Sequence, residues 1–268
     1  MNLKIKSLGF ALLFCVLFRL SFGFGSFINN TVHADYYWFS LGAYGTISVL
    51  LITAVFLKIE RRKFRDIGLN WESGTLPRFI KGALFGFVLT WLMTLVIILF
   101  ADLKIELAAD YNVPVFLFWS SAWIPLGFME EVAFRSYPFL KLNKVFGLRI
   151  TQLVIAILFA LYHVGEDSII TAFVGPGIWA FVYGMAAVYS KGIALPTGLH
   201  FAANFVLASM GEKKGVDPVF IVNYVTEPTT AMLNQTQYIA YAVQFVMLIV
   251  SVVLMERYIR CHKSDYVD

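Results

Sequence analysis

Residues 114–140, PVFLFWSSAWIPLGFMEEVAFRSYPFL, decide the fold class of this chain. The stretch is strongly apolar and holds only three charged side chains, Glu130, Glu131 and Arg135. A bilayer core of about 30 Å needs about 20 apolar residues in a helix. A charged residue inside such a span costs roughly 2.5–3.5 kcal/mol on insertion scales, so charges there usually serve a function. The stretch therefore predicts a membrane-spanning helix that carries chemistry.

The composition of the whole chain also indicates a membrane protein. Of the 268 residues, 59% are hydrophobic and 14% are charged, whereas soluble domains average roughly 45–50% apolar and about 25% charged residues. Seven further apolar stretches accompany residues 114–140. We therefore predict an all-α, polytopic transmembrane helix bundle of about eight spans, which forms a single membrane domain over residues 1–268. The expected spans are 8–27, 38–58, 80–101, 114–140, 150–165, 171–190, 193–210 and 238–257.

The first span, 8–27, also has the basic start and the apolar run of a signal peptide. Arg19 interrupts that run, however, and no Ala-x-Ala cleavage site follows it. We therefore interpret this segment as a retained helix. The sequence assigns no role to Arg19 or to the long polar segment 211–237.

Lysine and arginine residues are divided unequally between the predicted loops. With the N-terminus in the cytoplasm and eight spans, 16 of the 21 basic residues lie in cytoplasmic segments and 3 lie on the opposite side. Cytoplasmic loops of membrane proteins carry such an excess. We expect both termini in the cytoplasm and a multi-pass protein of the bacterial inner membrane. The net charge of +4 then reflects topology and argues against a nucleic-acid partner.

Helix geometry separates the roles of the charged residues in 114–140. Glu131 and Arg135 are four residues apart, so their side chains lie on one face and can pair. Adjacent residues of a helix point about 100° apart, so Glu130 faces another direction, without a cationic partner on its own helix. A carboxylate placed in this way is suited to act as a general base.

Polar side chains of two later spans are expected at the same depth. His163 lies one turn after Phe159 in one predicted span, and His200 and Asn204 share a face of another. An imidazole and an amide side by side can donate hydrogen bonds to one oxygen, as an oxyanion requires. At about 1.5 Å per residue, these groups and Glu130 lie roughly 10–20 Å from the cytoplasmic ends of their helices. Together they predict a polar cavity inside the bundle.

Three motifs, in this order, resemble the CAAX protease and bacteriocin-processing family, also called the Abi family. The family pattern is Glu-Glu-x-x-x-Arg, then Phe-x-x-x-His, then His-x-x-x-Asn. Here the motifs are Glu130–Arg135, Phe159–His163 and His200–Asn204. The resemblance defines a peptidase core over residues 115–207.

The resemblance implies an intramembrane endopeptidase that depends on a glutamate. In that scheme Glu130 and His163 activate a water for attack on the scissile carbonyl, and His200 and Asn204 form the oxyanion hole. No metal and no other cofactor is implied. The implied partners are a peptide or membrane-anchored protein substrate and membrane lipids. The supporting positions are Glu131, Arg135 and Phe159.

Three other functions remain open at this point. Glu and His can bind zinc, but the chain has no His-Glu-x-x-His helix and Asn is a poor zinc ligand. A non-catalytic membrane immunity or scaffold protein is the main alternative to an enzyme, because some members of the family are tied to bacteriocin self-immunity. A transporter is the third, because intramembrane carboxylates also relay protons, although the sequence has neither a repeated half nor a pair of broken helices.

Overall fold

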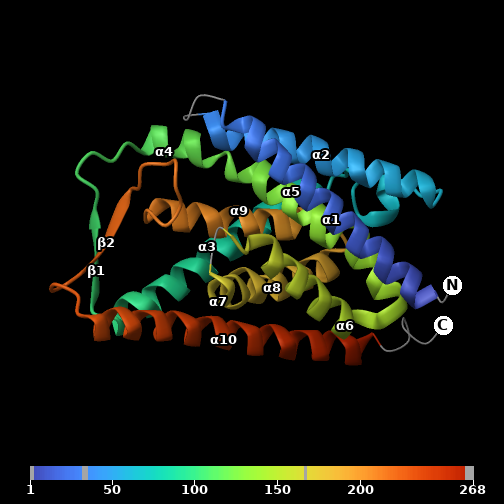
Figure 1. Ribbon diagram of the computed structural model, residues 1–268. Coiled ribbons are helices and arrows are strands. Elements are labelled where there is room, and N and C mark those ends of the chain that lie inside the picture. The colour runs from blue at the N-terminus through green and yellow to red at the C-terminus, as the bar shows by residue number, and fades with distance from the viewer. Residues whose placement is uncertain (1–2, 32–35, 166–167, 263–268) are drawn as a thin grey trace.

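The computed structural model describes residues 3–31, 36–165 and 168–262. The structure is 78% helical, and its long helices lie side by side in a bundle (Figure 1). A 3₁₀ turn, η2 Phe64–Ile67, precedes α3, and a π-helical turn, η3 Phe173–Gly177, precedes α8. The helices are α1 Leu3–Asn29, α2 Tyr37–Ile59, α3 Thr75–Phe100, α4 Val113–Ser120, α5 Trp123–Arg135, α6 Tyr137–His163, α7 Ile169–Ala172, α8 Ile178–Ser190, α9 Ala194–Ser209 and α10 Thr230–Cys261.

Six helical stretches in the described part of the chain are long and apolar enough to cross a membrane. The predicted spans 114–140 and 150–165 both fall in one of these stretches. The predicted span 193–210 forms α9, which at 16 residues is shorter than a usual membrane span. The count of eight spans therefore stays a prediction. The six stretches are Leu3–Asn29, Tyr37–Ile59, Thr75–Phe100, Val113–His163, Ile169–Ser190 and Thr230–Cys261.

The first described helix begins, and the last one ends, toward the same end of the molecule. α1 begins and α10 ends on the right of Figure 1. This arrangement agrees with an even number of membrane crossings, which would leave both termini on one side. That this side is the cytoplasm stays a prediction. Lys263, which contributes to the predicted charge bias, lies outside the described residues.

The predicted span 114–140 is not one helix. It divides into α4, α5 and the start of α6, with Ser136 between α5 and α6 at φ −96° and ψ −107°. Pro138 follows in the first turn of α6, where a helix needs no N–H from that residue. As a result the charged motif occupies the last part of α5, a helix of only 13 residues that ends at Arg135.

The basic segment 141–149, expected to link two spans, continues α6 instead. The helix is interrupted at Gly147, whose φ of 75° and ψ of 171° lie in a region that only glycine adopts without strain. The part of α6 after Gly147, which carries His163, therefore runs in a different direction from the part before it.

Helices α3 and α9 lie in very close contact. A Cβ atom at Gly82 or Gly86 would overlap the backbone of Leu195 or Leu199, and one at Gly198 would overlap the backbone of Phe79. Gly82 and Gly86 form a Gly-x-x-x-Gly pattern, which allows helix backbones to approach closely in membranes. This contact fixes the position of α9.

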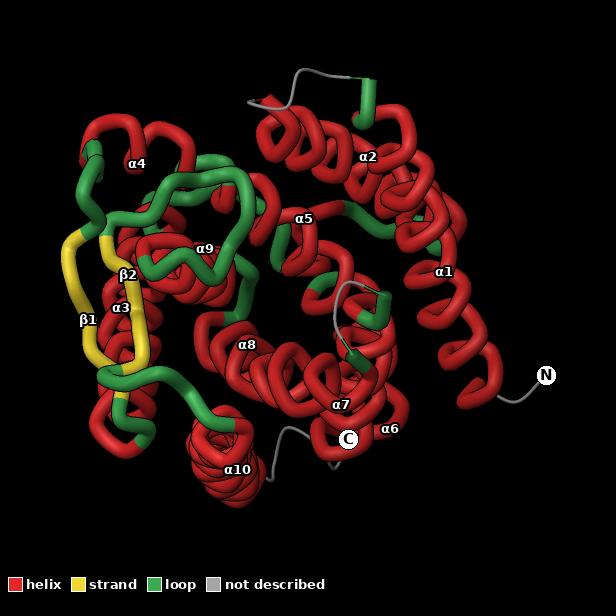
Figure 2. Tube along the Cα trace, turned by 60° about the vertical axis from the view of Figure 1, so that its left-hand side comes forward, coloured by secondary structure: helices red, strands yellow, loops and turns green. Residues whose placement is uncertain are grey.

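A small antiparallel sheet corrects the all-α prediction. β1 Leu103–Leu107 pairs with β2 Phe220–Tyr224, in the register Leu103 opposite Tyr224, and Figure 2 shows the two strands in yellow beside α3 and α9. The strand β2 lies in segment 211–237, to which the sequence assigned no role. Apolar and charged residues alternate along β1, which is the pattern of a strand with one exposed face. The sheet joins the end of α3 to the segment that leads into α10.

Aromatic rings of α1 hold α5 and α6 in place. Phe18 stacks on Tyr162 with ring centroids 5.6 Å apart and meets Phe134 edge-on at 6.2 Å. Phe14 stacks on Tyr137 at 5.4 Å. These rings are buried apart from Tyr162, which is half-buried. Through them the first helix positions both of the helices that carry the first two motifs.

Candidate active site

Three helices bring a carboxylate and two imidazoles together, as the sequence spacing predicts. Oε2 of Glu130, on α5, lies 3.6 Å from Nε2 of His200 on α9 and 3.9 Å from Nε2 of His163 at the end of α6. The side chains of Glu130 and His163 are 13% and 17% exposed. Both groups therefore keep a small opening to their surroundings although they lie inside the bundle.

Glu131 and Arg135 form the predicted pair one turn apart on α5. Nη1 of Arg135 lies 3.4 Å from Oε1 of Glu131, and neither side chain is exposed. The guanidinium carbon also lies 4.3 Å from the ring centre of Phe159 and 5.1 Å from that of Tyr183. In the described residues its three nitrogens have no hydrogen-bond partner. The buried cation is thus held by one carboxylate and by aromatic faces.

Phe159 contacts His163 through both its ring and its backbone. Its ring meets the His163 ring edge-on at 4.7 Å, and its backbone oxygen lies 2.9 Å from Nδ1 of His163. A carbonyl oxygen can only accept a hydrogen bond, so Nδ1 of His163 carries a hydrogen. In the neutral ring, Nε2 then has a free lone pair, and this atom is the one that faces Glu130.

His200 lies between the two glutamates. Its Nδ1 is 2.8 Å from Oε1 of Glu131, and its Nε2 is the atom that lies 3.6 Å from Oε2 of Glu130. Glu131 therefore fixes the orientation of an imidazole on another helix while it also pairs with Arg135. Such support by a carboxylate sets both the direction and the tautomer of a histidine.

The sequence analysis missed Tyr183 as a part of the site. Its ring lies on the ring of His200, with centroids 4.5 Å apart and an interplanar angle of 15°, and its side chain is buried. The residue lies on α8, which contributes none of the three motifs. A tyrosine in an apolar span was the available signal, but its partner depends on how α8 packs against α9.

Asn204 lies one turn after His200 on α9 and is half-buried. In the described part of the chain no hydrogen bond of its side-chain amide is found. Its role as an oxyanion donor therefore stays a prediction from spacing alone.

Arg19, for which the sequence gave no partner, approaches the site from α1. Its guanidinium carbon lies 5.8 Å from the ring centre of Tyr162, the neighbour of His163. This cation–π contact gives Arg19 an aromatic partner within the bundle.

No group of three or more His, Cys, Asp or Glu side chains in the described residues has the arrangement of a metal site. Glu131 and His200 are joined by a hydrogen bond, whereas Oε2 of Glu130 lies 3.6 Å from the other ring nitrogen of His200.

Comparison with known proteins identifies the family of the motif-bearing segment. Residues 112–206, about a third of the chain, match the family model described as type II CAAX prenyl endopeptidase Rce1-like. This range contains all three motifs and Tyr183. The match confirms the resemblance on which the sequence analysis relied. No match was found among curated proteins or among solved structures.

The family and the apolar helices together define the protein in general terms. It is an integral, multi-pass membrane protein with the signature of a CAAX-type protease. A protease of this kind acts on a peptide or protein in a membrane environment.

Proposed function

We propose that this chain, whose residues 112–206 match the CAAX endopeptidases, is a glutamate-dependent intramembrane endopeptidase. The observation that carries the proposal is the position of Oε2 of Glu130, within 4 Å of the Nε2 atoms of His163 and His200. A carboxylate between two imidazoles, in a largely buried place, is the arrangement that general acid–base hydrolysis requires.

Glu130 and His163 bind and activate the attacking water. Their facing atoms are 3.9 Å apart, too far for a direct hydrogen bond but close enough for both to reach one water. At an O···O or O···N distance of about 2.8 Å, that water donates one hydrogen to Oε2 of Glu130 and one to Nε2 of His163. Because Nδ1 of His163 donates to the Phe159 backbone, its Nε2 is free to accept. The water lone pair then points toward the substrate.

The reaction is a hydrolysis in two steps. The water oxygen forms a bond to the carbonyl carbon while one water proton moves to Glu130, and the carbonyl electrons become an oxyanion. The tetrahedral intermediate then breaks its C–N bond, and Glu130 returns the proton to the leaving nitrogen. The products are a carboxylic acid and an amine, and the glutamate ends as it began.

His200 and Asn204 stabilise the oxyanion as donors on one face of α9. Since Nδ1 of His200 donates to Glu131, its Nε2 donates only when the ring is an imidazolium. Arg135 pairs with Glu131, which in turn holds Nδ1 of His200. Glu131 and Arg135 thus act as positioning residues.

The substrate class is a peptide or a membrane-anchored protein that reaches Glu130 and the two histidines from within the bilayer or from the cytoplasm. The family name indicates prenylated CAAX sequences, from which the last residues are removed. Nothing in the described site recognises a prenyl group directly, so the first assay compares substrates with and without one.

The test uses the full chain in liposomes with fluorescent peptides that end in a CAAX sequence, either farnesylated or free, together with unrelated transmembrane peptides. Products are identified by mass spectrometry. We expect Glu130→Gln to lower the rate roughly 10²- to 10⁴-fold, the usual contribution of a general acid–base group. The matched control is Glu106→Gln, which alters an exposed glutamate of β1. Full activity of Glu130→Gln would overturn the proposal, and a biological effect that survives this substitution would favour the immunity or scaffold function.

A further inference from the structure

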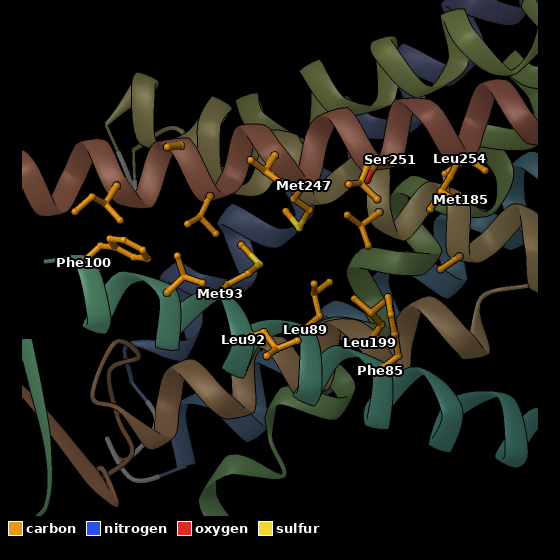
Figure 3. A pocket seen from close by; sticks show the side chains of 18 of the residues that line it. Phe85, Leu89, Leu92, Met93, Phe100, Met185, Leu199, Met247, Ser251 and Leu254 are labelled. Carbon is orange, nitrogen blue, oxygen red and sulfur yellow. The ribbon is translucent and has the colours of Figure 1, made fainter.

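A large apolar cavity lies away from the candidate site. It has a volume of about 1140 Å³, α3 and α10 form its sides, and α8 and α9 close it from behind. Figure 3 shows side chains of the two flanking helices that face each other across it, among them Met93 from α3 and Met247 from α10. Leu199 lines the cavity, whereas the next residue, His200, faces Glu131. Helix α9 therefore separates the cavity from the site.

The lining suits hydrocarbon and not water. No charged side chain lines the cavity, and the amides Asn234 and Gln235 lie together near the start of α10. Met93, Met185 and Met247 contribute flexible thioether side chains, which adapt to an apolar ligand of irregular shape. In a bilayer, a cavity of this kind is filled by acyl chains.

The length of the cavity suits hydrocarbon chains that run across the membrane. Its lining runs along α10 from Ala231 to Leu254, roughly 35 Å at 1.5 Å per residue, which is close to the thickness of a bilayer core. Extended hydrocarbon chains can therefore lie along it through the depth of the bilayer.

Basic side chains gather at one end of the cavity. Lys81 lies one turn before the lining residue Phe85 on α3, and Arg257 lies three residues after the lining residue Leu254 on α10. Lys191, in the turn between α8 and α9, lies at the same end. All three are exposed, and within the described ranges none takes part in an ion pair.

The acidic residue next to this basic end, Glu256, already forms an ion pair with Arg149. Glu256 accepts hydrogen bonds from Nε and Nη2 of Arg149 at 2.6 and 2.7 Å. At the opposite end the lining carries the uncharged amides of Asn234 and Gln235, and one residue of each charge, Asp102 and Lys104, follows the lining residue Phe100. The cavity therefore has a cationic end and an end without an excess of positive charge, with hydrocarbon surfaces between them.

We propose that the cavity between α3 and α10 binds an anionic phospholipid of the surrounding bilayer. Its acyl chains lie along the apolar lining, and its phosphate lies at the end marked by Lys81 and Arg257. This is the leaflet that the charge bias predicts to be cytoplasmic, where anionic lipids attract basic residues next to membrane helices. The site is independent of the reaction proposed above, because α9 lies between them.

The test measures lipid retention directly. The full chain is purified from mixed vesicles of phosphatidylglycerol and phosphatidylcholine, and native mass spectrometry counts the lipids that remain bound. We expect the wild type to keep one phosphatidylglycerol in preference to phosphatidylcholine. Ala242→Trp, which fills the cavity, should reduce this retention at least about tenfold, the effect of about 1.4 kcal/mol. Ile249→Trp, on the exposed face of the same helix, is the matched control.

A second variant tests the headgroup without filling the cavity. Lys81→Gln with Arg257→Gln should make retention of the two lipids equal while the protein remains folded. Equal retention by the wild type, or unchanged preference in the double variant, would overturn the proposal. Unchanged retention in Ala242→Trp would overturn it as well. None of these measurements depends on peptidase activity, so they separate this proposal from the proposed function.

Discussion

The ring of Tyr183 lies almost parallel on the ring of His200, with centroids 4.5 Å apart and an interplanar angle of 15°. Nδ1 of His200 also has a hydrogen bond to Glu131. The stacked tyrosine therefore fixes the plane of the imidazole, and the hydrogen bond fixes the rotation of the ring within that plane. Two helices, α8 and α5, thus control the direction of one imidazole on a third.

Removal of the Tyr183 ring should reduce catalysis more than substrate binding. In Tyr183→Ala the imidazole of His200 can tilt, and misplacement by about 1 Å costs roughly 10²-fold in rate. The measurement is kcat and KM for the best peptide in liposomes. Tyr183→Phe keeps the stacked ring and should retain most of the rate, whereas equal losses in both variants would contradict a role of the ring.

Removal of Arg135 should destabilise the protein strongly. Arg135→Met removes one of the two partners of the buried carboxylate of Glu131, and removal of one partner from a buried ion pair costs about 3–5 kcal/mol. Thermal unfolding in detergent, followed by circular dichroism, measures the effect. Glu256→Gln breaks the exposed pair with Arg149 and should change the unfolding temperature little; a comparable shift in both variants would refute the distinction.

A methyl group at Gly82 should disrupt the contact of α3 with α9. Gly82→Ala places a Cβ against the Leu195 carbonyl, and overpacking of this kind costs about 1–3 kcal/mol. Because α9 carries His200, activity should fall together with the unfolding temperature. Gly9→Ala on α1, where the added Cβ meets nothing within 4 Å, is the control and should have no harmful effect. Two equally stable variants would show that the close approach is unimportant.

A chelator should leave the peptidase active. The proposed water is held by Glu130 and His163, so catalysis requires no metal ion in this scheme. The check combines metal analysis of the purified protein with assays before and after treatment with phenanthroline. Stoichiometric zinc, together with loss of activity on chelation and its return on addition of zinc, would replace the proposed mechanism by a metal-dependent one.

Local spacing predicted the contacts that lie within single helices and the helices that supply the site. The pairing of Glu131 with Arg135 follows from one helical turn, and the three polar spans do meet. The break at Ser136 could also be suspected from Pro138, but the apolar run concealed it. Helix periodicity thus predicts well which residues share a face of a helix, but it predicts poorly where a helix begins and ends.

Contacts between distant elements could not be predicted in this way. The stacking of Tyr183 on His200 depends on how α8 packs on α9. The strands β1 and β2 are five residues each and more than 100 positions apart, so their pairing could not be predicted, although the alternation along β1 is typical of a strand. The oxyanion role of Asn204 still rests on spacing.

The strand pair has a mechanical consequence for the two helices that flank the lipid cavity. β1 follows α3 and β2 precedes α10, and Gln235 of α10 also donates a hydrogen bond to the Phe100 backbone at 3.4 Å. The sheet and this hydrogen bond therefore hold the two helices together at this end. Any increase in the distance between α3 and α10 is expected to be smallest at the sheet and greatest at the other end of the cavity, where Lys81 and Arg257 lie.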